Sequence, residues 1–370
     1  MTPHRICHVA SGDLWAGAEV QAYEMMAALH GAPEFEVSAI VLNDGPLRDA
    51  LRAAKVPTTL LPESSLTFDR LAGGLRRIVR RDGIQLLHSH RYKENLLVWA
   101  GTTLMRDRPK RVQTVHGAVE PFSGFRGAKM KAIRAADFAL ARSRFDLVHT
   151  VSHDLARRLE DELCGATLTT IHNAVRLDGE WPSPADARRE LAIERDALVV
   201  GALGRLEPVK NIASLLRVLK QMNRPHLVVL IAGDGSERAE LERLAQALGI
   251  AAQVRFLGFR DDVRTVLAAL DVYVMCSHHE GIPTSLLEAM ASELPCVCTA
   301  VGGIVEVVDE SCGVLVAAGD ENRFAGALEA LLRDRPRRLA LGQAAKTRVH
   351  ERFSVAQQSA RLRTAYLSLF

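Results

Sequence analysis

The sequence predicts an α/β protein built from two doubly wound, Rossmann-like domains, each with a parallel sheet. The chain has 370 residues, which is too long for one ordinary hydrophobic core and suits two domains. Short apolar runs alternate with amphipathic helical patterns along both halves, as in parallel sheets covered by helices. The turn-rich window Asp178–Pro184 interrupts this alternation once, and we interpret it as the connection between the domains.

Short apolar runs in the first half are predicted as strands, because each is bounded by turn or helix patterns. Amphipathic stretches with helical spacing lie between them, including Glu19–His30, Leu71–Arg81 and Leu155–Leu163. The predicted strands are Arg5–Ala10, Val37–Leu42, Thr58–Leu61, Ile84–His88, Arg111–Val115, Leu147–Val151 and Thr169–His172.

The alternation resumes after the connection, and the stretch Pro336–Phe370 is helical by pattern and long enough to return to the first domain. We therefore expect an N-terminal domain at 1–176, a C-terminal domain at 177–350 and a returning helix at 351–370. Parallel sheets bind ligands at the carboxyl ends of their strands, so two such domains facing each other would form a central cleft. The predicted strands of the second half are Leu198–Ala202, Leu227–Ile231, Val254–Leu257, Val272–Met275, Pro295–Thr299 and Gly313–Val316.

The composition argues against several classes of protein. Aromatic residues make up 5% of the chain, which disfavours a protein that stacks bases or sugars on aromatic platforms. The six cysteines form no C-x-x-C pair, so neither a zinc site nor a redox motif is predicted, and a reducing compartment is expected. The N-terminus lacks a signal-peptide pattern, and apolar runs such as Leu96–Met105 are too short to span a bilayer. We expect a cytoplasmic protein or one at the inner face of the cell membrane.

Basic residues are concentrated in one part of the chain. The segment Arg70–Arg144 contains 17 lysines and arginines against 5 acidic residues, although the whole chain has a net charge of +3. Within it, Arg126–Arg144 is rich in basic residues, and Met130, Ile133 and Leu140 would lie along one side of a helix. Such a segment suits contact with anionic lipid or an anionic acceptor, and a solvated basic surface is the alternative.

The first polar junction with a ligand-binding pattern is Gly204–Asn211, between a predicted strand and the next helix. Pro208 suits the first position of that helix, which would place Lys210 in its first turn. A cation there opposes the helix dipole by about 0.3–1 kcal/mol, and Arg205 adds a second cation. This arrangement lowers stability but suits a bound phosphate, and two exposed surface cations are the alternative.

The second junction runs from Glu280 to Glu288. Pro283 or Thr284 opens a helix, so backbone N–H groups near Thr284–Leu286 are available to an anion. Both glutamates are placed to face one site, where carboxylates would accept hydrogen bonds from vicinal sugar hydroxyls. Compensation of the helix dipole is the alternative for Glu280, and a solvated helix face is the alternative for Glu288.

Two glycine-rich junctions give weaker signals. Paired glycines in Gly302–Glu306 would let a ligand or the partner domain approach the backbone closely. The segment Gly12–Glu19 has the spacing of a P-loop, but Ala18-Glu19 stand where Lys-Ser/Thr is needed, which argues against an ATPase. The absence of a G-x-G-x-x-G motif argues against a dinucleotide-dependent dehydrogenase.

The ordered set of these elements resembles the family 4 retaining glycosyltransferases of the GT-B fold, over essentially the whole chain. The most specific match is the Glu-x7-Glu pattern from Glu280 to Glu288. Further matches, in the order of the family, are Gly17 and Glu19, Thr114-Val115-His116-Gly117, Val151-Ser152, His172-Asn173, Gly204-Arg205…Lys210, Gly233-Asp234-Gly235 and Gly302-Gly303…Glu306.

The resemblance implies an acceptor-side first domain and a second domain that binds a nucleotide sugar. Arg205 and Lys210 would neutralise the donor diphosphate and the charge that develops on the leaving group. Glu288 would bind the ribose hydroxyls, and Glu280 the hydroxyls of the transferred sugar. The expected donor contacts are Gly17, Arg205, Lys210, Gly233, Glu280, Gly281, Thr284, Ser285 and Glu288.

His116 resembles the histidine that touches the donor sugar beside its anomeric carbon, although the end of a buried strand also suits a core histidine. With Glu280, Arg205 and Lys210 it makes up the expected catalytic set. In the family, retention is explained by front-face attack, with a donor phosphate oxygen as the base, so no protein nucleophile is named. The chain has no D-x-D sequence, so we expect neither a metal nor a cofactor.

His88 and His90, followed by Arg91, end a predicted strand of the first domain. A histidine pair suggests a metal site, but no third ligand is near in the sequence, so acceptor contact or structural packing is preferred. The expected acceptor-side residues are His90, Arg91, Ser152 and Asn173.

The chain departs from the family pattern around the expected sugar pocket. Asn211 stands where glycine is frequent, Ile282 and Pro283 replace a common Phe-Gly pair, Val305 replaces a frequent proline and Ala174 a common glycine. These differences affect the identity of the donor, for which UDP is favoured over GDP.

The implied activity is transfer of a hexosyl group from a nucleotide-diphosphate sugar to a hydroxyl of a glycan or lipid-linked acceptor in cell-surface polysaccharide or lipopolysaccharide synthesis. An anionic membrane surface is a further expected partner, and nucleic acid is not. Two alternatives stay open: a sugar-nucleotide epimerase or phosphorylase on this fold, and a nucleotide-sugar binding protein without catalysis.

Overall fold

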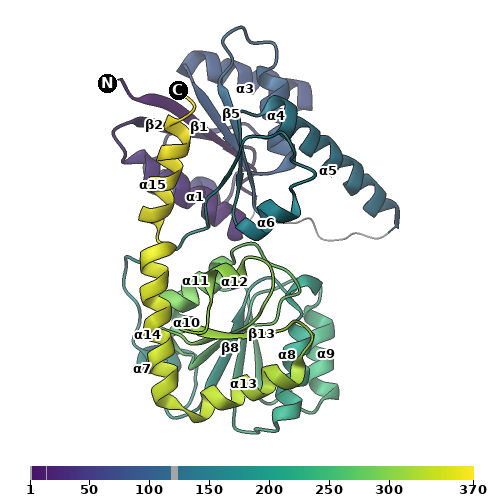
Figure 1. Ribbon diagram of the computed structural model, residues 1–370, viewed down its shortest axis with the longest axis vertical. Coiled ribbons are helices and arrows are strands. Elements are labelled where there is room, and N and C mark those ends of the chain that lie inside the picture. Colours follow the sequence, from purple (N-terminus) through teal and green to yellow (C-terminus); the bar gives the residue numbers. More distant parts are fainter. Residues whose placement is uncertain (1, 14, 118–123) are drawn as a thin grey trace. The chain divides into compact units, whose positions relative to one another are not determined.

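The computed structural model describes residues 2–13, 15–117 and 124–370, without the side chains of 124–128. The chain divides into two compact units (Figure 1). The first comprises Met1–Ala174 together with Val355–Phe370, and the second comprises Val175–Ser354. Each unit contains a parallel sheet with helices packed against it, so the predicted fold class is confirmed.

The first unit, within its described residues, contains a seven-stranded sheet in the order β3-β2-β1-β4-β5-β6-β7, with every neighbouring pair parallel. The strand order reverses between β1 and β4, and loops at such a switch point commonly carry ligand sites. All strands predicted for the first half are present, with ends that shift by one or two residues. They are β1 (His4–Ala10), β2 (Phe35–Val41), β3 (Thr58–Leu60), β4 (Leu86–Ser89), β5 (Lys110–Val115), β6 (Leu147–Thr150) and β7 (Leu168–Thr170).

The helices of the first unit cover its sheet, and α15 packs along α1 although the two lie at opposite ends of the sequence (Figure 1). Leu362 and Tyr366 of α15 enter the same core as Met25 and Leu29 of α1. The predicted helix at Leu155–Leu163 is shorter and begins earlier than expected. The helices are α1 (Gly17–His30), α2 (Pro46–Ala53), α3 (Phe68–Asp82), α4 (Tyr92–Thr102), α5 (Gly124–Arg144), α6 (His153–Arg158) and α15 (Val355–Leu367).

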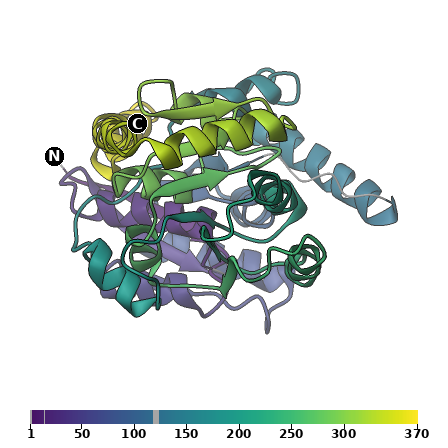
Figure 2. The ribbon, with the colours of Figure 1, turned by 90° about the horizontal axis from the view of Figure 1, so that it is seen from below.

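The second unit contains a six-stranded parallel sheet in the order β10-β9-β8-β11-β12-β13. Its apolar residues form two clusters, one on each face, and helices lie on both faces (Figure 2). All strands predicted for the second half are present within one residue of the expected ends. They are β8 (Val199–Leu203), β9 (Val228–Ala232), β10 (Val254–Gly258), β11 (Val272–Met275), β12 (Cys296–Thr299) and β13 (Gly313–Val316). The helical elements are α7 (Pro184–Glu190), η1 (Pro208–Lys210), α8 (Ile212–Met222), α9 (Arg238–Ala247), α10 (Val263–Ala268), α11 (Thr284–Ala291), α12 (Ile304–Val307), α13 (Glu321–Arg333) and α14 (Arg335–Arg352).

The C-terminal stretch predicted as one helical region forms two helices, α14 and α15. They are separated at Phe353 and Ser354, where the chain passes from the second unit to the first. The Val175 N–H donates to the Phe353 carbonyl over 2.9 Å, and Val175 also pairs with Ser354 as a parallel bridge. The two points at which the chain changes unit are therefore hydrogen-bonded to each other.

Candidate functional site

The loop after β8 carries Arg205 and Lys210 on a 3-10 turn, Pro208–Lys210. The α-helix α8 begins only at Ile212, so the prediction that Lys210 lies in the first turn of that helix is wrong. Asn211 separates the turn from the helix because its φ of +51° is left-handed, a conformation that asparagine tolerates better than most residues. This conformation explains why glycine is an acceptable alternative at position 211.

Glycines at the end of β9 allow this loop to lie close against the neighbouring strand. A Cβ atom on Gly233 would stand 1.9 Å from the carbonyl oxygen of Gly204, and one on Gly235 would stand 2.4 Å from that of Leu206. Neither position has room for a side chain. Gly233 therefore has a packing role that the sequence did not indicate, and its contact with a donor stays a prediction.

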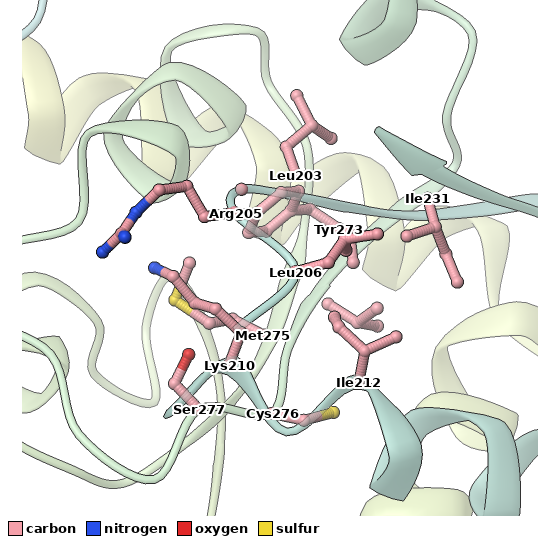
Figure 3. Close-up of a pocket in the computed structure, with 13 residues that line it drawn as sticks. Leu203, Arg205, Leu206, Lys210, Ile212, Ile231, Tyr273, Met275, Cys276 and Ser277 are labelled. Carbon is pink, nitrogen blue, oxygen red and sulfur yellow. The ribbon is translucent and has the colours of Figure 1, made fainter. Parts of the chain in front are cut away.

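Arg205 and Lys210 line a pocket at the carboxyl ends of β8 and β11 (Figure 3). Their side chains extend toward the same side of the pocket in this view, so the structure brings together the two cations that the sequence singled out. Cations on one rim suit an anion with several oxygens, such as a diphosphate. The lining residues are Ala202, Leu203, Gly204, Arg205, Leu206, Lys210, Ile212, Ile231, Tyr273, Val274, Met275, Cys276 and Ser277.

Lys210 is paired with Glu280, the first glutamate of the Glu-x7-Glu pattern. The Lys210 Nζ lies 2.6 Å from the Glu280 Oε1, and the Ser277 hydroxyl donates to the same oxygen over 2.7 Å. The two charged side chains are 18% and 12% exposed, so solvent screens their attraction less than it would on an open surface. The structure thus places two predicted site residues in direct contact and adds Ser277 to them.

The loop that carries Glu280 rests on the paired glycines Gly302 and Gly303. A Cβ atom on Gly302 would lie 2.0 Å from the Glu280 carbonyl oxygen, and one on Gly303 would lie 2.1 Å from that of Gly281. The Gly303 N–H also donates to the Glu280 carbonyl over 3.0 Å. These glycines therefore allow the close approach of the Glu280 loop, and contact of a ligand or of the partner domain with them stays a prediction.

Helix α11 begins at Thr284, one of the two predicted starts, and Pro283 is its N-cap. The Leu286 N–H donates to the Pro283 carbonyl over 3.1 Å. The prediction that this N–H is available to an anion is therefore wrong. The Ser285 hydroxyl oxygen accepts from the Tyr273 hydroxyl over 3.0 Å. Ser285 is therefore anchored to the underlying sheet, and its contact with a donor stays a prediction.

Glu288 lies one turn further along α11 and is half-buried, between the fully buried Leu287 and Ala289. A wholly solvated helix face, the alternative reading of this residue, does not match that burial. The structure therefore positions Glu280 just before helix α11 and Glu288 on that helix. Their separate sugar and ribose roles stay predictions.

The predicted first-unit residues Gly17 and Arg91 lie close together near the start of α1. Gly17 is the first residue of that helix, where backbone N–H groups lack partners within the helix. Glu19 of the same turn is 4% exposed and forms a hydrogen-bonded ion pair with Arg91, whose guanidinium also lies 3.9 Å from Asp13. Arg91 therefore faces two carboxylates at this helix end.

The other predicted acceptor-side residues are buried. Ser152 is the N-cap of α6 and accepts from the Leu155 N–H over 3.1 Å, so it has a structural role. Asn173 is 6% exposed. His90 is 4% exposed, and its two ring nitrogens lie 3.0 Å from His8 and 3.2 Å from His116. Acceptor contacts by His90, Ser152 and Asn173 stay predictions.

His88 and His90 have a third histidine beside them, so the prediction that no third ligand lies near is wrong. His8 from β1 is the missing member, and one ring nitrogen from each of the three lies within 4.8 Å of the others. His8 could not be predicted as a neighbour of the other two, because strands β1 and β4 are adjacent in the sheet but about 80 positions apart in the chain.

Comparison with known proteins identifies the family. The family model described as Glycosyl transferases group 1 matches residues 185–348, and the one described as Glycosyltransferase Family 4 matches residues 15–178. The chain is 32% identical over 256 residues to the lipopolysaccharide core biosynthesis glycosyltransferase LpsE of Rhizobium meliloti, covering 68% of this chain and 72% of that protein. The chain belongs to the family 4, group 1 glycosyltransferases. This glycosyltransferase is also 24% identical over 387 residues to the UDP-Gal:alpha-D-GlcNAc-diphosphoundecaprenol alpha-1,3-galactosyltransferase of Escherichia coli, covering 99% and 97% of the two chains.

Solved structures agree on the GT-B fold of the enzyme. Anabaena Alr3699/HepE in complex with UDP-glucose aligns with a TM-score of 0.85 at 22% identity, covering 98% of this chain and 99% of that one. Sucrose-phosphate synthase from Thermosynechococcus elongatus aligns with a TM-score of 0.81 at 21% identity, covering 99% of each chain. Across the residues that the structure describes, no helix of this glycosyltransferase is both long and apolar enough to cross a membrane.

Proposed function

We propose that the enzyme transfers a hexosyl group from a UDP-sugar to a hydroxyl of a glycan or lipid-linked acceptor, in lipopolysaccharide or cell-surface polysaccharide synthesis. Two relatives support the acceptor class by name, one a lipopolysaccharide core transferase and one acting on a diphosphoundecaprenol-linked sugar. A structural neighbour that holds UDP-glucose supports the donor class.

The observation that carries the proposal is the contact of Lys210 with Glu280 beside the pocket that Arg205 lines. In the structure, the charges of Lys210 and Glu280 compensate each other. A donor diphosphate would bring negative charge to Lys210 and Arg205, and Glu280 would then accept hydrogen bonds from hydroxyls of the transferred sugar. Lys210 would thus contact the diphosphate leaving group while Glu280, its partner in the ion pair, contacts the transferred sugar.

The proposed reaction retains the configuration of the donor sugar and proceeds by front-face attack. The acceptor hydroxyl would lose its proton to a phosphate oxygen of the departing diphosphate, so no protein nucleophile is needed. Arg205 and Lys210 would stabilise the negative charge on that oxygen in place of a divalent metal. Activity that is unchanged by chelator would agree with this, and a strict requirement for a divalent ion would contradict it.

Binding and transfer are separated by three variants. Lys210→Met should abolish the thermal stabilisation by UDP-sugar, whereas Lys220→Met, an exposed lysine of α8, should leave it intact. Glu280→Gln should retain UDP binding, since the diphosphate contacts remain, but lose both transfer and donor hydrolysis. A wild-type protein that is stabilised by UDP-sugars but never turns them over would be a binding protein instead, and conversion of the donor to its epimer would identify an epimerase.

The donor is best identified with a thermal-shift panel of UDP- and GDP-sugars. A ligand present at 100 times its dissociation constant stabilises by about 2.7 kcal/mol, which is readily measured. A shift with GDP-sugars but not with UDP-sugars would contradict the proposed donor.

We further propose that the enzyme is cytoplasmic and contacts an anionic membrane surface through α5. Lys129, Lys131 and Arg142 on this helix are exposed, but Phe138 and Ala141 are buried in the first unit, so part of the apolar side is not available to lipid. The side chain of Arg126 lies outside the described residues. Attachment would therefore be mainly electrostatic.

Sedimentation with vesicles tests this attachment. Wild-type protein should pellet with vesicles that contain anionic lipid at low salt and should be released at high salt. Lys129→Glu with Lys131→Glu should prevent pelleting. Arg52→Glu on α2 with Lys55→Glu in the turn that follows it, an equal change of charge on an exposed surface, should not. Equal pelleting with neutral and anionic vesicles would refute the proposal.

A further inference from the structure

A continuous series of hydrogen bonds runs through the interior of the first unit and ends at His116. It links strands β1, β4, β5 and β6 with helix α15. We call this series the histidine relay. Its members, in order, are His116, His90, His8, Tyr366, His88, Thr114 and His149, with the carbonyl of Ile171 at the far end.

The direction of the relay is set at the Ile171 end. The His149 Nε2 lies 2.7 Å from the Ile171 carbonyl oxygen, and because a carbonyl only accepts, that nitrogen carries the proton. In a neutral ring the Nδ1 is then a lone pair. It lies 2.9 Å from the Thr114 hydroxyl, which must donate to it.

The same count of donors and acceptors determines the hydrogen-bond directions at the next two members, His88 and Tyr366. Thr114 has used its one proton, so its oxygen accepts from the His88 Nε2 at 2.6 Å. The His88 Nδ1 is then a lone pair and accepts from the Tyr366 hydroxyl. Tyr366 has in turn used its proton and must accept from the next ring.

The last three members follow in the same direction. The His8 Nε2 donates to Tyr366 over 3.2 Å, so the His8 Nδ1 accepts from the His90 Nε2 over 3.0 Å. The His90 Nδ1 accepts from the His116 Nε2 over 3.2 Å. The His116 Nδ1 is left as a lone pair, and this buried atom has no hydrogen-bond partner among the described residues.

Burial keeps the rings neutral, as this assignment requires. It lowers the pKa of His8 and of His116 to about 3 and that of His149 to about 4. Burial, reinforced by the neighbouring rings, also places the pKa of His88 and of His90 well below the usual value. At pH 7 a ring with a pKa of about 3 is protonated in roughly one molecule in ten thousand.

We infer that the histidine relay holds His116 in the Nε2–H tautomer, so that its Nδ1 can only accept a hydrogen bond from a hydroxyl of the sugar substrate. His8, His88, His90, His149 and Tyr366 are then positioning residues, and none of them touches the substrate. The identity of the donor hydroxyl rests on the proposed function, but the tautomer of His116 does not. In this arrangement His116 supplies no proton to the leaving group.

A metal ion held by His8, His88 and His90 is the competing explanation for this cluster. Coordination needs a lone pair from each ring. In the relay the Nδ1 lone pairs of all three already accept hydrogen bonds, so a metal ion would have to break the series at several points. Zinc binding is therefore an outcome that would overturn the inference.

The direct test is the tautomer of each relay histidine in the ligand-free protein. Two-bond ¹H–¹⁵N correlation spectra of histidine-labelled protein at pH 7 should show His8, His88, His90, His116 and His149 all as Nε2–H tautomers. Assignment follows from single histidine-to-glutamine variants. An Nδ1–H tautomer or a charged ring at any of the five, or a shift of three ring nitrogens on adding Zn²⁺ alone, would overturn the inference.

Tyr366→Phe gives a second test that needs no large structural change. Without the hydroxyl, His8, His90 and His116 can reverse together, so that His116 carries its proton on Nδ1. The His116 signal should then report a mixture of tautomers. The value of kcat/KM should fall by the fraction of molecules that lose the acceptor form, which is about twofold for an equal mixture. Tyr92→Phe, an exposed tyrosine of α4, is the matched control and should change neither reading.

The two measurements separate failure of the inference from failure of the proposed function. An unchanged His116 tautomer in Tyr366→Phe would refute the relay whatever the enzyme transfers. A mixed tautomer together with unchanged transfer kinetics would instead show that no substrate hydroxyl binds the Nδ1, which refutes the substrate contact.

Discussion

Glu94 offers the sharpest test of the electrostatics of the first unit. It lies in the first turn of α4, it is 1% exposed, and neither of its carboxylate oxygens has a hydrogen-bond partner among the described residues. Burial raises the pKa of Glu94 from 4.5 to about 7, because the nearby Arg91 compensates only part of the cost of burying the charge.

The sign of the pH dependence follows from proton binding. The folded protein holds the Glu94 proton up to about pH 7, whereas the unfolded chain releases it near 4.5. Stability from this group is therefore complete below pH 4.5 and is lost as the pH rises through 7. A difference of about 2.5 pKa units corresponds to about 3 kcal/mol, as an order of magnitude.

Glu94→Gln removes the titrating group but keeps its size. We expect the variant to be more stable than wild type at pH 8, by up to about 3 kcal/mol, and nearly equal to it at pH 4.5. Glu160→Gln, at an exposed position of the same unit, should change stability by less than about 0.5 kcal/mol at either pH.

Urea unfolding followed by tryptophan fluorescence measures this difference in the first unit alone. Trp181 is the tryptophan of the second unit, so a Trp181→Phe background leaves Trp15 and Trp99 as reporters. If Glu94→Gln destabilises the protein equally at both pH values, the carboxyl is a charged partner of Arg91, and the reasoning is wrong.

Three further predictions address the stability of the protein at acid pH, the left-handed conformation of Asn211 and the close contact at Gly302. Because burial lowers the pKa of His149 to about 4, and the unfolded chain takes up protons near 6.5, stability should fall as the pH drops from 6.5 towards 4, and His149→Gln should reduce this fall in pH-dependent urea unfolding. Asn211→Gly should preserve both the melting temperature and UDP affinity, whereas Asn211→Val should lower the melting temperature, since valine is strained at a φ of +51°. Gly302→Ala should cost several kcal/mol in unfolding free energy and displace the Glu280 loop, while Gly326→Ala in helix α13, with nothing within 4 Å, should be neutral or stabilising by up to about 1 kcal/mol.

The strands could be predicted well because both sheets are parallel and buried, which gives short apolar runs such as Val272–Met275 their sharp ends. Helix starts were less predictable. Pro208 fits the first position of an α-helix and of a 3-10 turn equally, and only the left-handed Asn211 shows where α8 begins. Backbone torsion at that residue depends on its tertiary contacts, including the hydrogen bond from its side chain to the Cys276 carbonyl over 3.3 Å.

Some parts of the candidate site could likewise be predicted from the sequence, and others could not. The cations and glutamates of the second unit could be found because they cluster within short segments next to predicted strand ends. The relay could not, because His8 and His149 sit inside apolar strands and Tyr366 lies on the last helix. Likewise, the approach of the Glu280 carbonyl to Gly302 depends on how two loops stack, which no local pattern records.

The position of α15 has a consequence for the order in which the protein takes shape during synthesis. Residues Val175–Ser354 are continuous, so the ribosome can release a complete second unit before the chain is finished. The first unit, although most of it is made earlier, must wait for Leu362 and Tyr366 to fill its core. The half of the enzyme that is translated first is therefore the half that is completed last, and loss of the final helix would damage the N-terminal sheet rather than the neighbouring C-terminal one.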